Sequence, residues 1–373
     1  MAGPMRILYI SSKKNWGGVT NWMNRTALGL GKRGHRVYVI AHPLGRFVRS
    51  ASPELKVIPK KLGMDYNPLM VAFIHGFIIR NRIQLVLTNI EKEIMIGGAA
   101  GRLAKIPNIR RVGREDDFNM RLRVKWHHRL FVNRCIVPCD LIRENALKRA
   151  PWLDPSAFTT IYNGRNPAFF SQDDILKQRG KWDLGAEDIV LGVTTQLTKV
   201  KEVDVLIRAF AHLSRTHPNC YLVVTGEGPE RRGLERLTRD LEVSHRVIFN
   251  GFTSDPLLTA AAYDIAVSSS RFEGFPNTVV EYFAVARPVV TTDAGGVLEL
   301  VEHMHNGFVV PCSDEQKLYQ GLETLVRDSH LRERLGRNAL KSIQERFSED
   351  TMLDNLETLF EETIANHAIS KQI

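Results

Sequence analysis

Short apolar runs alternate with longer segments of helical periodicity along most of this chain. Residues 19–30 carry apolar side chains at positions 19, 22, 23, 27 and 30, which is the spacing of one buried helix face. Between such segments stand short apolar runs whose length is typical of buried strands. On this pattern we expect strands at 6–10, 36–40, 55–58, 84–89, 135–137, 189–193, 220–225, 246–249, 263–268, 288–291 and 308–310.

The expected helices lie between these strands. They cover 19–30, 68–80, 94–104, 124–132 and 203–213, with another from Pro276 and one or two amphipathic helices after Ser348. Strands that alternate with helices predict parallel sheets with helices on both faces. Because the pattern restarts in the second half, we predict an α/β protein of two doubly wound, Rossmann-like domains that face a cleft. Ligands of such domains bind at the carboxyl ends of the strands.

Turn signals in residues 163–171 mark the expected domain boundary, where Asn-Gly and Asn-Pro pairs meet a polar run. We therefore expect an N-terminal domain over 1–168 and a C-terminal domain over 169–350. Residues 351–373 would form a C-terminal helix that packs back on the first domain.

The two halves of the chain differ strongly in charge. Residues 1–165 carry 29 Lys and Arg against 10 Asp and Glu, a balance of +19, whereas residues 166–373 carry 22 against 31, a balance of −9. So large a split indicates that the first half faces a polyanion. A solvated basic surface is the simpler alternative.

Several classes of protein are disfavoured by the composition. The four cysteines, at 135, 139, 220 and 312, have no paired metal-ligand spacing, so we expect reduced thiols in a cytosolic protein and no metal site. No segment approaches the roughly 20 apolar residues that a membrane-spanning helix needs. The apolar start at 7–10 is too short for a signal peptide.

Residues 271–281 hold the strongest candidate site. This segment follows the expected strand at 263–268 and places two carboxylates, Glu273 and Glu281, around a Gly-Phe-Pro-Asn turn. A strand end, a helix start and two acceptors for hydroxyl groups suit a sugar joined to a diphosphate. An ordinary surface loop followed by a helix has about equal weight for the bare pair, because short motifs match by chance.

The turn itself supplies the expected phosphate contacts. Pro276 fits the first turn of a helix, where its missing N–H needs no partner. The other first-turn N–H groups have no intrahelical acceptor and can hold an anion. A helix from Pro276 also puts Asn277 and Glu281 on one face. The residues expected to bind the donor here are Gly274, Phe275, Pro276, Asn277, Thr278 and Glu281.

Three further loops follow expected strands. Gly17 and Gly18 precede a helix and suit a phosphate or substrate loop, although a plain tight turn is equally compatible, and they do not match the dinucleotide fingerprint. The loop at 194–201 carries two lysines that can neutralise a diphosphate leaving group. The glycines at 226–229 would let a flat base or ribose lie against the backbone. The residues concerned are Gln196, Lys199, Lys201, Gly226 and Gly228.

Taken in order, these pieces resemble the retaining glycosyltransferases of family 4, in the GT-B superfamily, over nearly the whole chain. The resemblance also rests on Gly34-His35, on 161–164, on Gly251, on 293–296 and on 307–311. It implies that the C-terminal domain binds a nucleotide-diphosphate sugar, expected to be UDP-linked, without a metal or other cofactor. Glu273 would contact the donor sugar, Glu281 the ribose, and Lys201 the diphosphate.

The chain departs from this family at three positions. It has Gln196 where the family usually has Arg, and a neutral amide makes no charge-assisted bond to phosphate; Lys199 is a candidate replacement. It has Glu202 where the family usually has Gly. The histidine that often follows a strand near residue 112 is absent, and Arg114, Glu115 and Asp116 stand there instead, so we expect either that one of them serves the acceptor or that this function is rearranged.

The acceptor is expected on the N-terminal domain, and transfer in the cleft. Within residues 110–134, basic side chains at 121, 123, 125, 129 and 134 interleave with Leu122, Trp126, Leu130 and Phe131. Such a helix can lie at an anionic membrane surface or hold a phosphorylated acceptor, although an apolar core face with a solvated basic face is as common. We expect a glycolipid or polysaccharide acceptor, as in bacterial lipopolysaccharide or envelope glycan synthesis, and a peripheral location on the inner face of the cytoplasmic membrane.

Two other classes of function stay open at this stage. A sugar-nucleotide epimerase or a phosphorylase could use the same fold. A basic nucleic-acid-binding protein could use the same charge, but no RNA- or DNA-binding motif is present, so we expect no nucleic-acid partner. The sequence does not indicate an oligomeric state.

Overall fold

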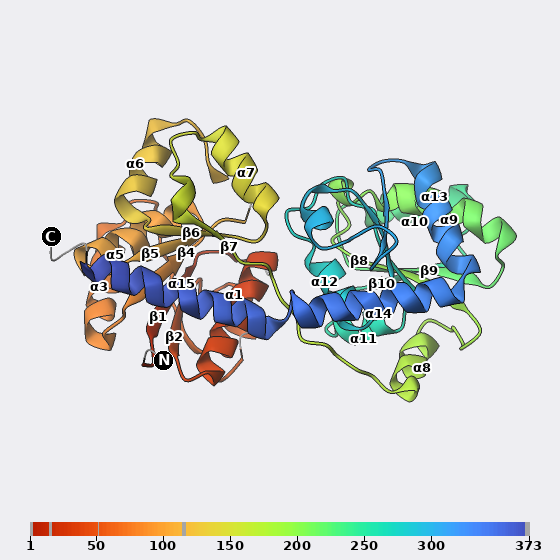
Figure 1. Ribbon diagram of the computed structural model, residues 1–373, viewed down its shortest axis with the longest axis horizontal. Helices are drawn as coiled ribbons and strands as arrows, with labels where there is room; N and C mark the ends of the chain where they lie inside the picture. Colours follow the sequence, from red (N-terminus) through yellow and green to blue (C-terminus); the bar gives the residue numbers. More distant parts are fainter. Residues whose placement is uncertain (1–2, 15–16, 51, 114–116, 370–373) are drawn as a thin grey trace. The chain divides into compact units, whose positions relative to one another are not determined.

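The computed structural model describes residues 3–14, 17–50, 52–113 and 117–369. It divides the chain into two compact units (Figure 1). Unit 1 consists of Met1–Tyr162 and Thr351–Ile373, and unit 2 of Asn163–Asp350. Each unit is built on one parallel sheet, in the order β3-β2-β1-β4-β5-β6-β7 in unit 1 and β10-β9-β8-β11-β12-β13 in unit 2. The predicted fold class of two doubly wound domains is confirmed.

The strands of unit 1 are short, and β4 and β5 near the middle of the sheet are completely buried. They are β1 (Arg6–Ser11), β2 (Arg36–Ala41), β3 (Lys56–Pro59), β4 (Leu85–Thr88), β5 (Asn108–Arg111), β6 (Arg134–Val137) and β7 (Phe158–Thr160). The helices are α1 (Gly18–Lys32), α2 (Arg46–Ser50), α3 (Pro68–Asn81), α4 (Glu91–Glu93), η1 (Ile94–Gly98), α5 (Ala99–Leu103), α6 (Leu122–Phe131), α7 (Asp140–Arg149), η3 (Pro155–Ala157) and α15 (Glu349–Ile369). The π-helical η1 and α5 together occupy the expected helix at 94–104.

Two hydrophobic clusters cover the two faces of the sheet of unit 1. One joins the strands to α1 and α15, and the other joins them to α3, η1 and α5. The last long helix, α15, buries a face that recurs every three or four residues, which is why it packs on a sheet far away in the sequence. Figure 1 shows α15 lying along unit 1.

Unit 2 repeats this plan with strands of similar length. They are β8 (Ile189–Thr194), β9 (Cys220–Thr225), β10 (Val247–Gly251), β11 (Ile265–Ser268), β12 (Val289–Thr292) and β13 (Phe308–Val310). The helices are α8 (Gln172–Gly180), η4 (Lys199–Lys201), α9 (Val203–Thr216), α10 (Arg231–Asp240), α11 (Pro256–Ala261), α12 (Asn277–Ala284), η5 (Gly295–Glu299), α13 (Glu315–Arg327) and α14 (Ser329–Glu345). One large cluster packs α9, α13 and α14 against the sheet.

Two strands of unit 1 were not predicted. β5 contains two arginines and β7 only three residues, so neither forms an apolar run. All four residues of β5 are nevertheless buried, because the strand lies between β4 and β6 in the middle of the sheet.

Candidate functional site

A pair of opposite charges lies beyond the carboxyl ends of the strands in unit 2. Lys201 Nζ donates a hydrogen bond to Glu273 Oε1 across 2.5 Å, and Ser270 Oγ donates to the same oxygen across 2.8 Å. The side chains of Lys201 and Glu273 are 21% and 15% exposed. The two residues predicted as catalytic are therefore in contact, in a partly buried place where a charge-assisted bond is strong and a ligand can still compete for it.

The loop that carries Lys201 is held by the end of β11. Ser269 Oγ donates to the Lys201 carbonyl oxygen across 2.8 Å, and the Arg271 N–H donates to the Val200 carbonyl oxygen across 2.9 Å. Two loops that are about 70 residues apart in sequence are thus tied together by hydrogen bonds to the backbone of residues 200 and 201. The position of the ammonium group is set by these bonds as well as by Glu273.

Glu202, next to Lys201, has a left-handed backbone conformation with a φ of 44°. This is the position where the resembled family has glycine, which adopts such a conformation without steric cost. The carboxylate of Glu202 accepts hydrogen bonds of 2.8 and 2.9 Å from Ser313 Oγ and lies 3.8 Å from Arg271 Nε. These contacts, which glycine could not make, offset a backbone strain of about 1 kcal/mol.

Helix α12 begins at Asn277, one residue later than predicted, and Pro276 is its N-cap. Asn277 Oδ1 accepts a hydrogen bond from Asn163 Nδ2 across 2.7 Å, and Glu281 Oε1 lies 3.4 Å from a guanidinium nitrogen of Arg165. Asn277 and Glu281 therefore share one face of the helix, as predicted. This face is occupied by the first residues of unit 2, and Glu281 already has a cationic neighbour.

The helix start supplies fewer anion donors than the sequence suggested. The Asn277 N–H donates to the Phe275 carbonyl oxygen across 3.0 Å, and Pro276 has no N–H. Thr278, the second residue of α12, has no intrahelical acceptor for its own N–H. Its amide is the best placed of the predicted donors for a phosphate.

The glycines of the 226–229 loop are explained by packing between two loops. Gly226 has a φ of +133°, and a Cβ there would collide with the Thr195 carbonyl oxygen. A Cβ on Gly228 would collide with the Leu197 carbonyl oxygen, and the Leu197 N–H donates to the Glu227 carbonyl oxygen across 3.0 Å. These two glycines let the ends of β8 and β9 lie against each other, and whether a base or ribose also rests on them stays a prediction.

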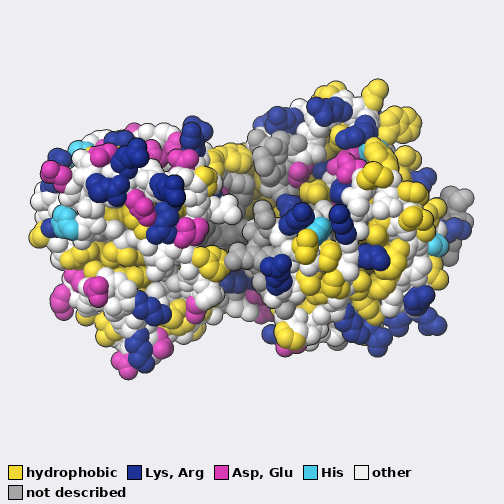
Figure 2. Space-filling view, turned by 180° about the vertical axis from the view of Figure 1, so that it is seen from behind, with side chains coloured by type: hydrophobic (Ala, Val, Ile, Leu, Met, Phe, Trp, Pro, Cys, Tyr) yellow, Lys and Arg dark blue, Asp and Glu magenta, His cyan; other side chains and the backbone are white. Residues whose placement is uncertain are grey.

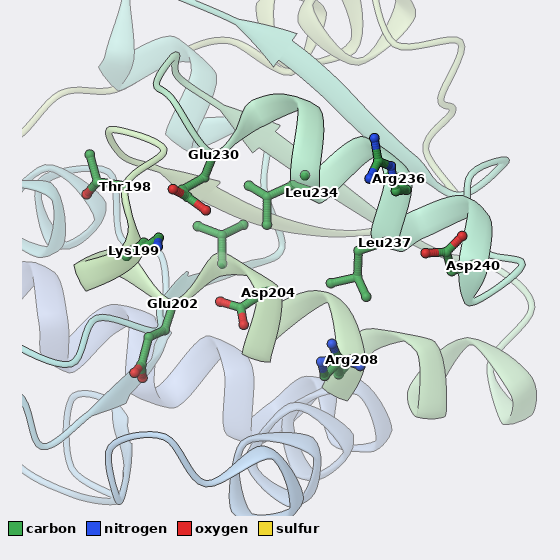
Figure 3. A pocket seen from close by; sticks show the side chains of 12 residues that line it. Thr198, Lys199, Glu202, Asp204, Arg208, Glu230, Leu234, Arg236, Leu237 and Asp240 are labelled. Carbon is green, nitrogen blue, oxygen red and sulfur yellow. The ribbon is translucent and has the colours of Figure 1, made fainter.

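Gln196 and Lys199 are exposed, and no contact in the described part of the chain joins either side chain to the Lys201–Glu273 pair. Lys199 instead lines a groove of about 540 Å³ between α9 and α10. Figure 3 shows Thr198 and Lys199 at one end of this groove and Asp240 at the other. Both acidic and basic side chains line it, so the groove lacks the concentrated positive charge that a diphosphate needs.

A buried network of hydroxyl groups supports the strand ends that carry the site. The sequence did not indicate this network. The Thr194 N–H donates to Tyr282 Oη across 2.7 Å, and Tyr263 Oη lies 3.1 Å from Thr194 Oγ1 and 2.9 Å from Thr225 Oγ1. Burial raises the pKa of Tyr263 to about 12 and that of Tyr282 further, so both stay neutral. The network fixes the ends of β8 and β9; its residues lie in apolar runs and carried no local signal.

In unit 1, Gly17 is the N-cap of α1 and Gly18 its first residue. No acidic residue stands in the first turn of α1, which suits an anion at the helix start. Gly17 has extended backbone and open space where a Cβ would be, so packing does not require glycine there. The predicted acceptor residues Arg114, Glu115 and Asp116 lie outside the described residues.

Buried charges near the carboxyl edge of the sheet of unit 1 were also missed. The guanidinium of Arg110 lies 4.4 Å from the ring centre of Phe118, and that of Arg111 lies 4.7 Å from the ring centre of Trp22. Burial lowers the pKa of Arg111 to about 10. The carboxylate of Glu93 is buried as well. None of these three residues lies inside an element that the sequence pattern predicted, so no local signal marked them as buried.

No group of three or more His, Cys, Asp or Glu side chains in the described ranges could hold a metal ion. All four cysteines are free. Among the helices that the structure describes, none is both long enough and apolar enough to span a membrane.

The chain matches two protein families, one on each unit. The family described as "Glycosyltransferase Family 4" matches residues 16–169, and the family described as "Glycosyl transferases group 1" matches residues 174–342. The lipopolysaccharide core biosynthesis glycosyltransferase LpsE of Rhizobium meliloti is 33% identical over 176 residues, which are 47% of this chain and 51% of LpsE. The chain spans about half the length of the curated relatives it matches.

Solved structures match over almost the full length. HepE of Anabaena, solved in complex with UDP, is 22% identical, with a TM-score of 0.84 over 96% of this chain and 100% of that structure. A glycosyltransferase of Rickettsia africae is 19% identical, with a TM-score of 0.87 over 98% of this chain and 100% of that structure. At these identities the likeness shows the fold, which is the GT-B fold. With a family 4 match on unit 1 and a group 1 match on unit 2, the chain belongs to the glycosyltransferases of the GT-B fold.

Proposed function

We propose that this protein transfers a sugar, with retention of anomeric configuration, from a UDP-linked donor on unit 2 to a glycolipid or polysaccharide acceptor on unit 1. The observation that carries the proposal is the Lys201–Glu273 pair, which lies at the edge where doubly wound domains bind their ligands. Relatives named for lipopolysaccharide core synthesis and structures solved with UDP and UDP-glucose support the reaction class and the donor.

Donor binding would exchange the partners of the ion pair. The diphosphate carries more negative charge than a carboxylate and competes with Glu273 for Lys201. Once separated from the ammonium, Glu273 accepts hydrogen bonds from hydroxyl groups of the donor sugar. Glu281, steadied by Arg165, accepts from the ribose hydroxyls, and the Thr278 N–H donates to a phosphate oxygen.

The transfer step needs no side chain as a base. The bond between C1 of the sugar and the diphosphate oxygen breaks, and its electron pair goes to that oxygen. The acceptor hydroxyl oxygen forms the new bond to C1 from the same face, and its proton goes to the departing diphosphate. Lys201 stabilises the charge that grows on the leaving group, so its contribution is larger in the transition state than in the bound donor.

Unit 1 contributes an exposed apolar and basic surface on α6. Leu122, Trp126 and Leu130 are 70%, 61% and 38% exposed, whereas Val124 and His128 are the buried residues of this helix. The apolar stripe therefore points away from the core, unlike the alternative of an ordinary core-facing helix. Figure 2 shows hydrophobic side chains interleaved with Lys and Arg over unit 1. We take this surface to contact an anionic membrane that carries the acceptor.

Ligand-induced stabilisation tests the donor proposal. UDP should raise the melting temperature by an amount that grows with its concentration, more than ADP or GDP do, and the Lys201→Ala variant should lose most of that rise. An NMR assay with UDP-sugars and extracted glycolipids should then show a product with the anomeric configuration of the donor. No stabilisation by any nucleoside diphosphate would contradict the donor site. Isomerisation of the donor sugar without an acceptor would indicate an epimerase.

A further inference from the structure

Four neighbouring strands of unit 1 each lead into a basic side chain at the same edge of the sheet. The strands are adjacent in the order β3-β2-β1-β4. The basic residues that follow them are Lys60 and Lys61 after β3, His42 after β2, Lys13 and Lys14 after β1, and Lys92 after β4. We propose that this lysine rim, the five lysines around His42, binds phosphate groups of the acceptor. Anion binding at the rim stands alone, and only its assignment to the acceptor rests on the proposed function.

Hydrogen bonds between the loops show that these segments converge. The His42 N–H donates to the Ser11 carbonyl oxygen across 3.1 Å, and the Lys60 N–H donates to the Ala41 carbonyl oxygen across 2.8 Å. Sheet pairing thus continues past the strand ends. The buried carboxylate of Glu93 accepts from both Ser12 and Asn89, at 2.7 to 3.0 Å, which joins the loops that carry Lys13, Lys14 and Lys92.

His42 lies at the centre of the rim and is 7% exposed. Burial and the positive charges of Lys14, Lys61 and Lys92 lower its pKa. Its Nδ1 accepts a hydrogen bond of 3.2 Å from the Leu44 N–H, so the neutral ring carries its proton on Nε2. Positive charges nearby favour the uncharged form of a histidine. The lowered pKa of His42 therefore reflects lysines that gather around it without enough negative charge to balance them.

The carboxylates near the rim are already engaged. Glu93 is bonded as described, and Glu91 pairs with His127. Asp65 lies 3.8 Å from Lys92 but is 59% exposed. Within the described ranges, Lys13, Lys14, Lys60 and Lys61 have no ion pair, and all four are exposed. Their mutual repulsion would be relieved by a bound anion.

At the opposite edge of the sheet, several basic residues have acidic partners from the last helix. Acidic residues of α15 pair there with basic residues at the end of α1, before β2 and at the start of β6. These pairs are Arg33 with Asp354 and Glu357, His35 with Glu357, and Arg134 with Glu362. These three basic residues thus have acidic partners, whereas four of the rim lysines, at the edge where such domains bind ligands, have no ion pair in the described ranges.

Phosphate on a lipid-linked acceptor fits this arrangement best. Lysine ammonium groups are compact charges that hold phosphates, and several of them match more than one anionic oxygen. Lys60 Nζ lies 4.7 Å from the ring centre of Phe73, on α3, where Leu69 is 82% exposed. The rim therefore borders apolar surface, which suits an acceptor with phosphates next to a lipid.

The test follows the ring of His42 by NMR in the full-length protein, with inorganic pyrophosphate as the probe and His42→Asn for assignment. At constant ionic strength, pyrophosphate should raise the pKa of His42 in a saturable way. A Lys14→Gln, Lys61→Gln, Lys92→Gln triple variant should raise that pKa without the probe and weaken pyrophosphate binding at least tenfold. Lys56→Gln, which removes a charge from the other end of β3, should change neither. If pyrophosphate leaves the pKa of His42 unchanged, the proposal is overturned.

The results of the two experiments, taken together, distinguish this inference from the donor proposal. If UDP raises the melting temperature while pyrophosphate leaves His42 unchanged, the rim is wrong and the donor site stands. If pyrophosphate shifts His42 but no nucleotide binds, the rim stands and the donor proposal fails. Vesicles of phosphatidylglycerol that shift His42 as strongly as pyrophosphate would make the rim a lipid surface and overturn the acceptor assignment. If the triple variant has a lowered melting temperature, the single variant Lys61→Gln is used in its place.

Discussion

At the carboxyl edge of the sheet in unit 2, two cations lie beside carboxylates, whereas at the same edge in unit 1 four of the five rim lysines have no ion pair within the described ranges. Lys201 contacts Glu273 and Arg165 lies beside Glu281 in unit 2. In unit 1, lysines from three loops surround His42. Both sheets are parallel and doubly wound, so the loops after the strands, and not the fold, set the chemistry of each unit.

The two units also differ in how many large hydrophobic side chains they expose. Of the large hydrophobic side chains that are exposed in the described residues, twelve belong to unit 1 and five to unit 2. Exposed apolar side chains beside basic ones favour an extended partner such as a membrane. Paired, partly buried charges favour a small ligand that displaces one partner. This contrast supports the proposal that unit 1 binds the large anionic partner and unit 2 the nucleotide.

Removing charge from α6 should produce the largest effect. We expect anionic vesicles to bind the protein at low salt and to release it as salt rises. Loss of four charges at about 1 kcal/mol each should weaken this binding on the order of 1,000-fold. Sedimentation with phosphatidylglycerol vesicles would measure it. The residues to change to Gln are Arg121, Arg123, Lys125 and Arg129.

The control removes as many charges from unit 2 and should leave vesicle binding nearly unchanged. It changes Arg215, Arg232, Arg236 and Arg239 to Gln. Equal losses in the two quadruple variants would mean that net charge alone drives association, and the contrast between the units would fail.

A pair of glycine substitutions contrasts the two ligand loops. Gly226→Ala should destabilise unit 2 by about 3 kcal/mol, because the new Cβ meets the Thr195 carbonyl oxygen at a positive φ. Gly17→Ala should cost less than about 1 kcal/mol, the loss of a glycine N-cap, because its backbone is extended and the space beside it is open. Thermal unfolding followed by circular dichroism checks both. A stable Gly226→Ala protein would show that the loop can relax, contrary to the packing argument.

Lys201→Ala should lower kcat by on the order of 100-fold, about 2.7 kcal/mol, because the cation acts mainly on the charge of the leaving group. Donor affinity should change less. Lys199→Ala is the matched control on the same turn and should cost little, since its side chain lines the groove between α9 and α10. Steady-state kinetics at saturating donor would measure kcat for both variants. Near-normal turnover in Lys201→Ala would remove this residue from the reaction.

Glu281→Gln should weaken UDP binding by about 2 kcal/mol, the scale of a hydrogen bond to a charged group. The change keeps the size of the side chain, so the fold should survive. Calorimetry with UDP would measure the loss, and Glu230→Gln, in the groove between α9 and α10, should bind UDP normally. An unchanged affinity in Glu281→Gln would exclude the carboxylate from the ribose site.

Glu202→Gly should have the smallest effect, less than about 1 kcal/mol on stability, because relief of the left-handed strain and loss of the Ser313 bonds oppose each other. In a Ser313→Ala background those bonds are already gone, so Glu202→Gly should become stabilising. Urea unfolding of the four proteins would show the sign. A stabilising effect that is equal in both backgrounds would mean that the Ser313 bonds contribute nothing.

Much of the fold could be predicted from local pattern. The strands expected at 220–225 and 308–310 coincide with β9 and β13 to the residue, because apolar runs bounded by turn residues carry their own signal. β5 was missed because Arg110 and Arg111 interrupt its apolar pattern. Burial of those guanidinium groups depends on aromatic rings from other segments, which no local pattern reveals.

The candidate site likewise has some features that local sequence predicts and others that depend on the tertiary structure. Glu273 and Glu281 belong to one short motif, and the spacing of Asn277 and Glu281 on one helix face follows from helical geometry. The contact between Lys201 and Glu273 joins residues that are 72 positions apart and depends on the order of the strands. The role of Gly226 and Gly228 in loop packing likewise requires the neighbouring strand.

By itself, the sequence determined the alternation of strands and helices, the two-domain plan, the motif at 271–281 and the excess of positive charge in the first half, because each is a local or summed property. Only the tertiary structure decided which charges have partners. It carried the acids of α15 to one edge of unit 1 and drew Lys14, Lys61 and Lys92 together at the other. Electrostatic energy depends on distance in space, and that distance is set when strands from separate parts of the chain pair in one sheet.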